Sequence, residues 1–337
     1  MARYLEDWGG NFNLQMIILS YKQLVKIKNL PVGTYIFSDI ERLTPEFAET
    51  LALVWKQLSN AKDIRLLNHP TRSMKRYELL RNLYELGWNN FNVYWLTEFR
   101  VPKMFPVFIR VSNDHNSLLT SLLNSVQELN AAINKFLEKG ESREDKIITE
   151  FCDTSNTQGI FKKYSAFIIG ECIIPCSISF GYDWFLKGSL PYKEMDEAMR
   201  KEETEYLEKN PHESYLRKIF NLARIDYVRI DYSLLNGKIQ TWEINTNPSG
   251  LYTIEEDKNK IVCGLPINEY LSKKIALAFE NINSKTNPMN QILISKKNNS
   301  LQEITREIKL ILKSSLPYPL NIMNINMLKN ITKFKVF

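Results

Sequence analysis

The sequence is poor in the residues that bind soft metal ions or form disulfides. It has only three histidines and four cysteines, which are His69, His115, His212, Cys152, Cys172, Cys176 and Cys263. No two cysteines form a Cys-x-x-Cys pair, so a zinc site built from thiolates and imidazoles is not expected. We expect free thiols in a reducing, cytoplasmic setting, and any metal ion to be a hard cation bound by oxygen atoms.

Long apolar runs and blocks of like charge are also missing. The apolar stretch Ala166–Ile174 is interrupted by Glu171 and is far shorter than the ~20 residues of a membrane span. The N-terminus has no apolar signal core. The 44 basic and 38 acidic residues leave a net charge of +6 without any long run of one sign, which argues against a nucleic-acid-binding tail. The sequence therefore predicts neither a transmembrane segment nor a nucleic-acid partner.

The residues that are present predict an α+β fold in three parts. The 337 residues, of which 44% are hydrophobic, have room for two or three domains of about 100–200 residues. We expect a small α/β domain at 1–70, a domain at 71–282 with subdomains at about 71–150 and 151–282, and a helical, basic extension at 283–337. Helices are expected at Phe12–Ile27, Pro45–Leu58, Ser73–Leu86, Leu118–Leu137, 192–221, Asn268–Ile282 and Ser300–Leu312. Strands are expected at Tyr35–Phe37, Ile64–Leu67, Phe105–Val111, Ile147–Cys152, Phe161–Ile169, Cys172–Ser179, Ile225–Ser233 and Lys238–Asn245.

Two of these strands predict a hairpin that places acidic residues on one face. If Leu235-Asn236-Gly237 is a three-residue loop, Asp231 faces Thr241, and Glu243 is its diagonal neighbour roughly 7–8 Å away. Asn245 joins the same face because side chains alternate with a period of two. A two-residue Asn-Gly loop would place Asp231 and Glu243 on opposite faces, so we favour the longer loop.

Two carboxylates and an amide oxygen on one sheet face are suitable ligands for Mg²⁺. The alternative for the same pattern is a hairpin with one polar face in contact with water. Arg229 lies on the face of Asp231 by the same alternation. We expect it either to bind an anionic group or to form a salt bridge with Glu243.

The order of these features over residues 65–282 resembles the ATP-grasp superfamily of ATP-dependent ligases, in which the nucleotide lies between two α+β subdomains. The fairly specific part is Asp231 followed by the ending Glu243-Ile-Asn245-x-x-Pro248. The resemblance implies ATP and Mg²⁺, with Asp231, Glu243 and Asn245 as metal ligands and Lys75 and Arg110 as phosphate contacts. It also implies a hinge in which Glu150 faces the adenine amino group and the backbone of Phe151 and Cys152 faces its ring edge.

The sequence departs from the family pattern at three places. Arg110 replaces a lysine and keeps a permanent charge with a fork suited to phosphate. The loop Ser112–Ser117 has no glycine, so side chains, His115 among them, would replace the backbone amides that usually close on the phosphates. At the position of a ribose-binding acid, alignment places Lys163, which is expected to contact the nucleotide.

The activity implied by the resemblance is the ATP-dependent joining of a carboxylate to an amine through an acyl phosphate, with release of ADP and phosphate. Arg110 and Arg229 are the expected catalytic residues. The substrates would be small molecules or peptides, bound by loops in 1–70 and 180–222, and the chain could form a homodimer. Two alternatives stay open, a small-molecule kinase and a nucleotide-binding protein without turnover.

Overall fold

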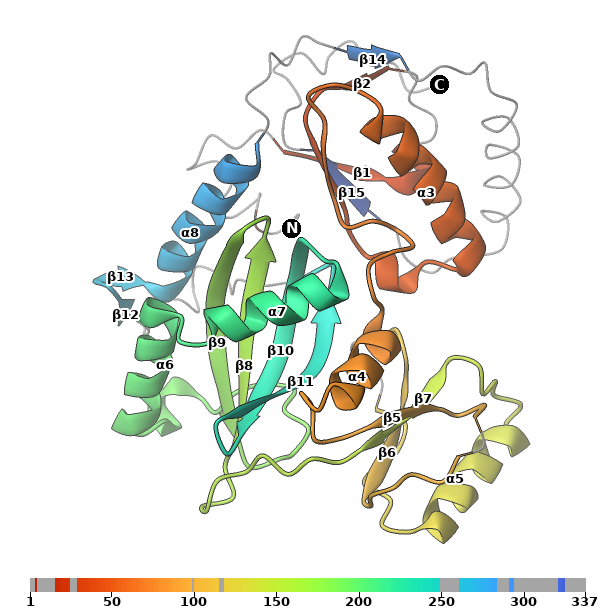
Figure 1. Cartoon of the computed structure of the whole chain (residues 1–337). Helices are drawn as coiled ribbons and strands as arrows, with labels where there is room; N and C mark the ends of the chain where they lie inside the picture. Colours follow the sequence, from red (N-terminus) through yellow and green to blue (C-terminus); the bar gives the residue numbers. More distant parts are fainter. Residues whose placement is uncertain are drawn as a thin grey trace.

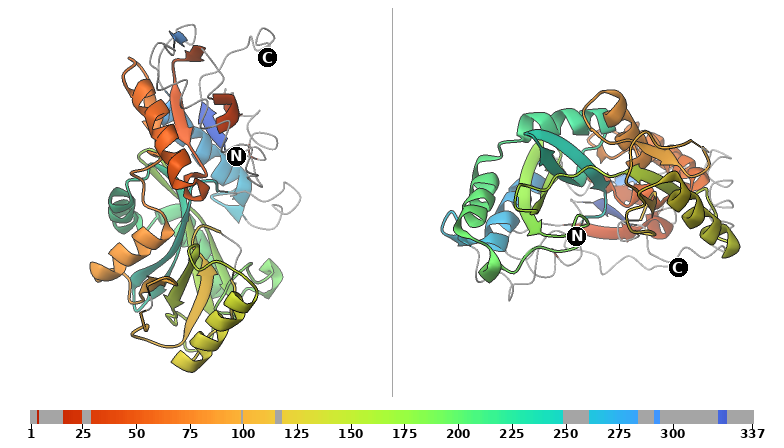
Figure 2. Two further views of the ribbon diagram at one scale, coloured as in Figure 1. Left: turned by 90° about the vertical axis from the view of Figure 1, so that its right-hand side faces the viewer. Right: turned by 90° about the horizontal axis from the view of Figure 1, so that it is seen from below.

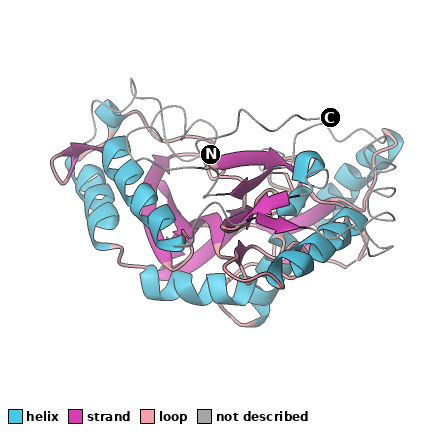
Figure 3. Cartoon of the chain, turned by 90° about the horizontal axis from the view of Figure 1, so that it is seen from above, coloured by secondary structure: helices cyan, strands magenta, loops and turns pink. Residues whose placement is uncertain are grey.

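The computed structural model describes residues 4, 16–24, 29–98, 100–114, 118–248, 261–283, 291–293 and 321–324. They form an N-terminal unit, a three-stranded sheet with one covering helix, and a four-stranded sheet with helices packed against it (Figure 1). The N-terminal unit lies at one end of the molecule and the three-stranded sheet at the other (Figure 2). Seen from above, the strands lie in the middle and most helices along the margin (Figure 3). Helices and antiparallel sheets together confirm the expected α+β class.

The N-terminal unit is built on a four-stranded sheet in the order β1-β15-β3-β4. Helix α3 begins as expected, with Pro45 in its first turn and the side chain of Thr44 accepting a hydrogen bond from the Phe47 amide at 3.3 Å. Its apolar face packs on a core that includes Tyr21 and Phe37. The elements are β1 (Ile17–Ser20), α2 (Tyr21–Leu24), β2 (Asn29–Pro31), β3 (Thr34–Phe37), the 3₁₀ turn η2 (Ile40–Arg42), α3 (Pro45–Ser59) and β4 (Arg65–Leu67).

Two expectations about the chain ends differ from the structure. Within the range expected as one helix at Phe12–Ile27, the described residues form strand β1 followed by a single helical turn. In the tail expected to be helical, the described pieces are strands, namely β14 (Gln291–Leu293), which pairs with β2, and β15 (Asn321–Asn324), which lies between β1 and β3. The helix expected at Ser300–Leu312 lies outside the described residues.

The three-stranded sheet has the order β5-β7-β6, antiparallel throughout. Its elements are α4 (Arg76–Glu85), β5 (Val93–Trp95), β6 (Val107–Val111), α5 (Val126–Glu138) and β7 (Lys146–Glu150). Helix α5 begins eight residues later than expected. Leu118 and Leu123 instead form bridges to Arg110 and Val107 of β6, and the side chain of Ser125 caps the helix by accepting from the Glu128 amide at 3.2 Å.

The four-stranded sheet has the order β11-β10-β8-β9 and is also antiparallel. Its strands are β8 (Phe161–Ile169), β9 (Cys172–Gly181), β10 (Tyr227–Leu235) and β11 (Lys238–Asn245). Helices α6 (Glu197–Lys209), α7 (Glu213–Ala223) and α8 (Ile267–Ile282) pack against β8 and β9. The remaining elements are η3 (Tyr192–Glu194), β12 (Ile261–Val262) and β13 (Leu265–Pro266).

Buried Asn68 attaches the N-terminal unit to this sheet. Its amide oxygen accepts from the backbone amides of Asp226 and Tyr227, both at 3.0 Å, and its amide nitrogen donates to the carbonyls of Phe37 and Tyr227. These contacts hold the end of β3 beside the start of β10. Among the described residues, no helix is both long enough and apolar enough to cross a membrane.

Candidate active site

The hairpin of β10 and β11 has a different turn from the one expected, but it still places Asp231 and Glu243 on one face. Leu235 pairs with Lys238, so the loop is the two residues Asn236 and Gly237, both with positive φ (51° and 78°), as in a type I′ turn. The expected three-residue loop is therefore wrong. A β-bulge restores the alternation, because Tyr232 pairs with Thr241 while Asp231 pairs with Glu243. The two carboxylates lie directly opposite each other.

One face of this sheet packs on helices, and the other bears the candidate site. Tyr164 and Tyr232 reach the helix side, where their hydroxyls contact Glu202 and His212. Their neighbours along the strands, Lys163 and Asp231, therefore point to the opposite face. The side chains of Asp231 and Glu243 are only 5% and 13% exposed, which rules out the alternative of a polar face in contact with water.

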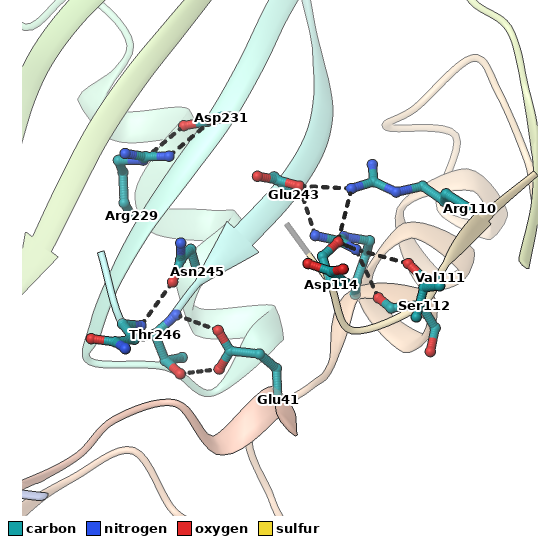
Figure 4. Close-up of polar contacts among 12 residues, drawn as sticks. Glu41, Arg110, Val111, Ser112, Asp114, Arg229, Asp231, Glu243, Asn245 and Thr246 are labelled. Carbon is teal, nitrogen blue, oxygen red and sulfur yellow. Dashed lines mark hydrogen bonds and ion pairs between the residues drawn. The ribbon is translucent and has the colours of Figure 1, made fainter. Parts of the chain in front are cut away.

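Asp231 is surrounded by donors from two strands, and Figure 4 shows its contact with Arg229. One carboxylate oxygen accepts from Ser165 Oγ at 2.9 Å and from Arg229 Nε at 3.1 Å, and the other lies 3.8 Å from Lys163 Nζ. Burial is the largest single influence and works against the charge of Arg229, but the nearby Asp231, Cys176 and Glu243 together outweigh it and raise the pKa of Arg229. Arg229 forms an ion pair with Asp231 at 3.1 Å, a partner that was not among those expected for it.

Glu243 is held by two guanidinium groups. Its Oε2 accepts from Arg76 Nη2 at 2.7 Å and from Arg110 Nη2 at 3.0 Å. Arg76 is 2% exposed, and its Nη1 also donates to the carbonyl oxygens of Val111, Ser112 and Asp114 at 3.3, 2.8 and 2.9 Å. Burial, and then the nearby Arg110 charge, lower the pKa of Arg76 to about 10, so it stays charged at neutral pH.

Arg76 is the residue that sequence reasoning missed, because the neighbouring Lys75 was expected to face the phosphates. Lys75 instead precedes the first turn of α4, and its Nζ donates to the Leu43 carbonyl of the N-terminal unit at 3.0 Å. Burial lowers the pKa of Lys75. Lys75 is the N-cap with an extended backbone, whereas Arg76 is the first residue of the helix, so the two basic side chains leave the chain in different directions.

Of the three residues of the expected hinge, two line the cavity and one does not. The Glu150 carboxylate is buried and accepts from the Asn92 amide at 2.9 Å, the Tyr94 hydroxyl at 2.8 Å and the Lys103 amide at 2.9 Å. Its side chain is directed into the subdomain and does not line the cavity, contrary to the expected contact with an adenine amino group. Phe151 and Cys152 do line the cavity, and burial raises the pKa of the Cys152 thiol to about 11.

A cavity of about 540 Å³ extends from Phe151 and Cys152 to Asp231 and Glu243. At one end lie aromatic rings, where Trp184 has its centroid 4.9 Å from that of Phe108 and 5.7 Å from that of Phe151. Six basic side chains and three acidic ones also line the cavity, namely Arg42, Arg110, Lys162, Lys163, Lys187, Arg229, Asp114, Asp231 and Glu243. The excess of positive charge favours an anionic ligand.

The expected loop Ser112–Ser117 is only partly described. Ser112 is buried, its amide donates to the Asp145 carbonyl at 2.8 Å, and its own carbonyl accepts from Arg76. His115, expected to contact phosphate, lies outside the described residues together with Asn116 and Ser117.

Of the expected metal ligands, Glu243 and Asn245 lie on β11, and Asp231 lies on β10 opposite Glu243. Asn245 pairs directly with Arg229 across the hairpin and lines the cavity, and its Oδ1 accepts from the Asn247 amide at 2.8 Å. Among the described residues, no group of three or more His, Cys, Asp or Glu side chains could hold a metal ion. Two opposed carboxylates and one amide oxygen nevertheless suit Mg²⁺, which takes few protein ligands and completes its shell with water and substrate phosphates.

Comparisons with known proteins returned solved structures only. No protein-family model matches the chain, and no curated protein matches it. A D-alanine–D-alanine ligase from Helicobacter pylori is similar at 16% identity and a TM-score of 0.38, over 72% of this chain and 71% of that one. The VanG D-Ala:D-Ser ligase from Enterococcus faecalis has 16% identity and a TM-score of 0.40, over 68% of each chain. A D-alanine–D-alanine ligase from Bacillus anthracis complexed with ATP has 12% identity and a TM-score of 0.38, over 68% of this chain and 75% of that one.

Proposed function

We propose that the protein is an ATP-dependent ligase that activates a carboxylate as an acyl phosphate and joins it to an amine. The observation that carries this proposal is the division of one cavity into an aromatic end and a cationic end. Aromatic rings stack on the flat face of a nucleobase, and Phe108, Phe151 and Trp184 form such an end. Arg110, Lys163 and Arg229 line the cationic part, where a triphosphate would be neutralised.

The reaction needs charge neutralisation more than acid–base chemistry. An oxygen of the substrate carboxylate attacks the γ-phosphorus, the bond from that phosphorus to its bridging oxygen breaks, and ADP leaves with the electron pair. The amine nitrogen then attacks the acyl carbon, inorganic phosphate leaves, and the nitrogen loses a proton. Arg110 and Arg229 would stabilise the charge that develops on the transferred group.

Asp231, Glu243 and Asn245 would hold Mg²⁺ in this scheme. The ion, when bound, would supply positive charge between the phosphates. Its arrival would compete with the arginines for the same carboxylate oxygens, since Arg229 contacts Asp231 while Arg76 and Arg110 contact Glu243. A cytoplasmic location belongs to the same proposal and is supported by the free thiols of all four cysteines. The homodimer stays a prediction.

The proposal is tested by titrating the protein with ATP and MgCl₂ in a calorimeter and then measuring ADP, with pooled carboxylates and pooled amines added separately and together. We expect saturable ATP binding, and ADP formation that needs a carboxylate and yields an amide when the amine is present. A phosphorylated product without an amide would identify a kinase instead. Binding without turnover for any pool would identify a nucleotide-binding protein, and no ATP binding would contradict the proposal altogether.

Substitution of Arg110 tests the phosphate contact. Arg110→Ala removes one charge-assisted contact, so ATP affinity should fall by about 10- to 100-fold. Arg110→Lys keeps the charge but loses the planar fork and should fall between alanine and wild type. Calorimetry measures the affinities, and Arg100→Ala, at a side chain that is 63% exposed, is the matched control. Equal ATP affinity for wild type and Arg110→Ala would remove Arg110 from the site.

A further inference from the structure

One side chain of the N-terminal unit reaches the cavity. Of the described residues that line it, Arg42 alone comes from the first 70 residues of the chain. Its side chain is 34% exposed, and its Nε donates to Asp39 Oδ1 at 2.6 Å. Asp39 itself is fully buried. An arginine oriented by a buried carboxylate and open to a cationic cavity is arranged to meet a ligand.

The turn that carries Arg42 is attached to the end of the metal-ligand strand. The Glu41 carboxylate is buried and accepts from the Thr246 amide at 3.1 Å and from the Thr246 hydroxyl (Figure 4). The Ile40 amide donates to Thr246 Oγ1 at 3.1 Å. Thr246 directly follows Asn245, so the position of Arg42 is coupled through three hydrogen bonds to the expected metal site.

Successive residues along β11 contact successive parts of the cavity wall. Near its start, Gln240 Oε1 lies 3.9 Å from the Cys152 thiol at the hinge, where the aromatic rings gather. Further along, Glu243 contacts Arg110. At its end, Thr246 holds the turn with Arg42. From the start of β11 to its end, the cavity would therefore hold the base of ATP and then its phosphates. Arg42 would lie past the expected metal ligands, where the carboxylate substrate has to approach the phosphates.

We propose that Arg42 binds an anionic group of the substrate that is activated, at a position away from the reacting carboxylate. This inference rests on the proposed function and names its substrate class, a carboxylic acid with a second oxyanion, either a carboxylate or a phosphate. The guanidinium fork matches both groups with two parallel hydrogen bonds. Asp39 is a positioning residue that orients the fork. A substrate with a cationic head group would be repelled by Arg42 and by the excess of basic side chains around it.

The test compares three probe pools, each with ATP, MgCl₂ and pooled amines. They are straight-chain monocarboxylates, dicarboxylates of matching lengths, and phosphorylated hydroxy acids. ADP formation by wild type should be supported by one of the two dianionic pools and not by the monocarboxylates. The responding pool tells whether the second group is a carboxylate or a phosphate. For that pool, Arg42→Ala should raise the KM by about 10- to 100-fold with a smaller change in kcat, while Arg42→Lys and Asp39→Asn should give intermediate KM values.

Controls separate this inference from the proposed function. Calorimetry should give the same ATP affinity for Arg42→Ala as for wild type, and Arg72→Ala, at an exposed arginine just after the N-terminal unit, should leave the KM unchanged. Failure of wild type to bind ATP would contradict the proposed function. ATP binding without ADP formation from any pool would contradict the proposed function as well, whereas equal use of monocarboxylates or a KM unaffected by Arg42→Ala would overturn the role of Arg42 alone.

Discussion

Glutamine in place of Glu243 is expected to lower ATP turnover by about 10³-fold, because under the proposed function it removes the charge of a metal ligand beside the transferred phosphoryl group. The same change should also destabilise the fold. Arg76 and Arg110 have side chains only 3% and 8% exposed, and both would lose their carboxylate partner. Breaking a buried ion pair from one side lowers the free energy of unfolding by about 3–5 kcal/mol. Turnover is measured as ADP release, and stability by urea denaturation.

Two variants make this result interpretable. Glu243→Asp keeps the charge but shortens the side chain, so it should recover more stability than turnover. Glu171→Gln alters a carboxylate that is 88% exposed in its ion pair with Arg217, and it should change the free energy of unfolding by less than about 1 kcal/mol. Wild-type ADP release by Glu243→Gln at limiting MgCl₂ would exclude Glu243 as a metal ligand.

Alanine at position 76 is expected to have a far larger effect than alanine at position 75. Arg76→Ala leaves the Glu243 carboxylate with one guanidinium partner fewer and removes the donor to the carbonyls of Val111, Ser112 and Asp114. We expect a loss of about 3 kcal/mol in the free energy of unfolding and a turnover reduced by about 10²-fold. Lys75→Ala removes one hydrogen bond to Leu43, which is typically worth about 1 kcal/mol.

The two neighbouring variants are controls for each other, because both remove a basic side chain from the start of α4. Arg76→Lys separates charge from geometry, since one ammonium group cannot serve three carbonyls and a carboxylate in a fixed fork. Denaturation curves and ADP release should therefore rank Arg76→Ala below Arg76→Lys and well below Lys75→Ala. Equal losses for the two alanine variants would show that Arg76 does not position Glu243.

The hairpin shows how far the pattern of residues predicted the candidate site. Alternation along the chain was enough to place Arg229 with Asp231, and Glu243 with Asn245, on common faces. The loop length was wrong because a β-bulge at Trp242 shifts the register, and a bulge has no signal in the alternation of polar and apolar residues. The shared face survived because the bulge and the shorter loop offset each other.

At the expected hinge, the pattern of residues did not predict the contacts of the side chain. Glu150 ends a strand beside two residues that line the cavity, and sequence position alone predicted that it would face a ligand. Its carboxylate instead accepts from three backbone amides and the Tyr94 hydroxyl. Buried polar groups need such partners, and those partners come from residues 92–104, which no pattern in 147–152 could indicate.

By itself, the sequence determined the features that depend on neighbours along the chain. These are the α+β class, the cap of α3 at Thr44, the strands of the hairpin, and the set of carboxylates on one face. The physical reason is that helix and strand periods, turns and caps are settled within about ten residues. Tertiary structure alone decided that Arg76 rather than Lys75 contacts Glu243, that β15 joins the N-terminal sheet, and that Arg42 enters the cavity. Each of these depends on pairing between segments far apart in the chain, where the partner that satisfies a buried group is set by packing.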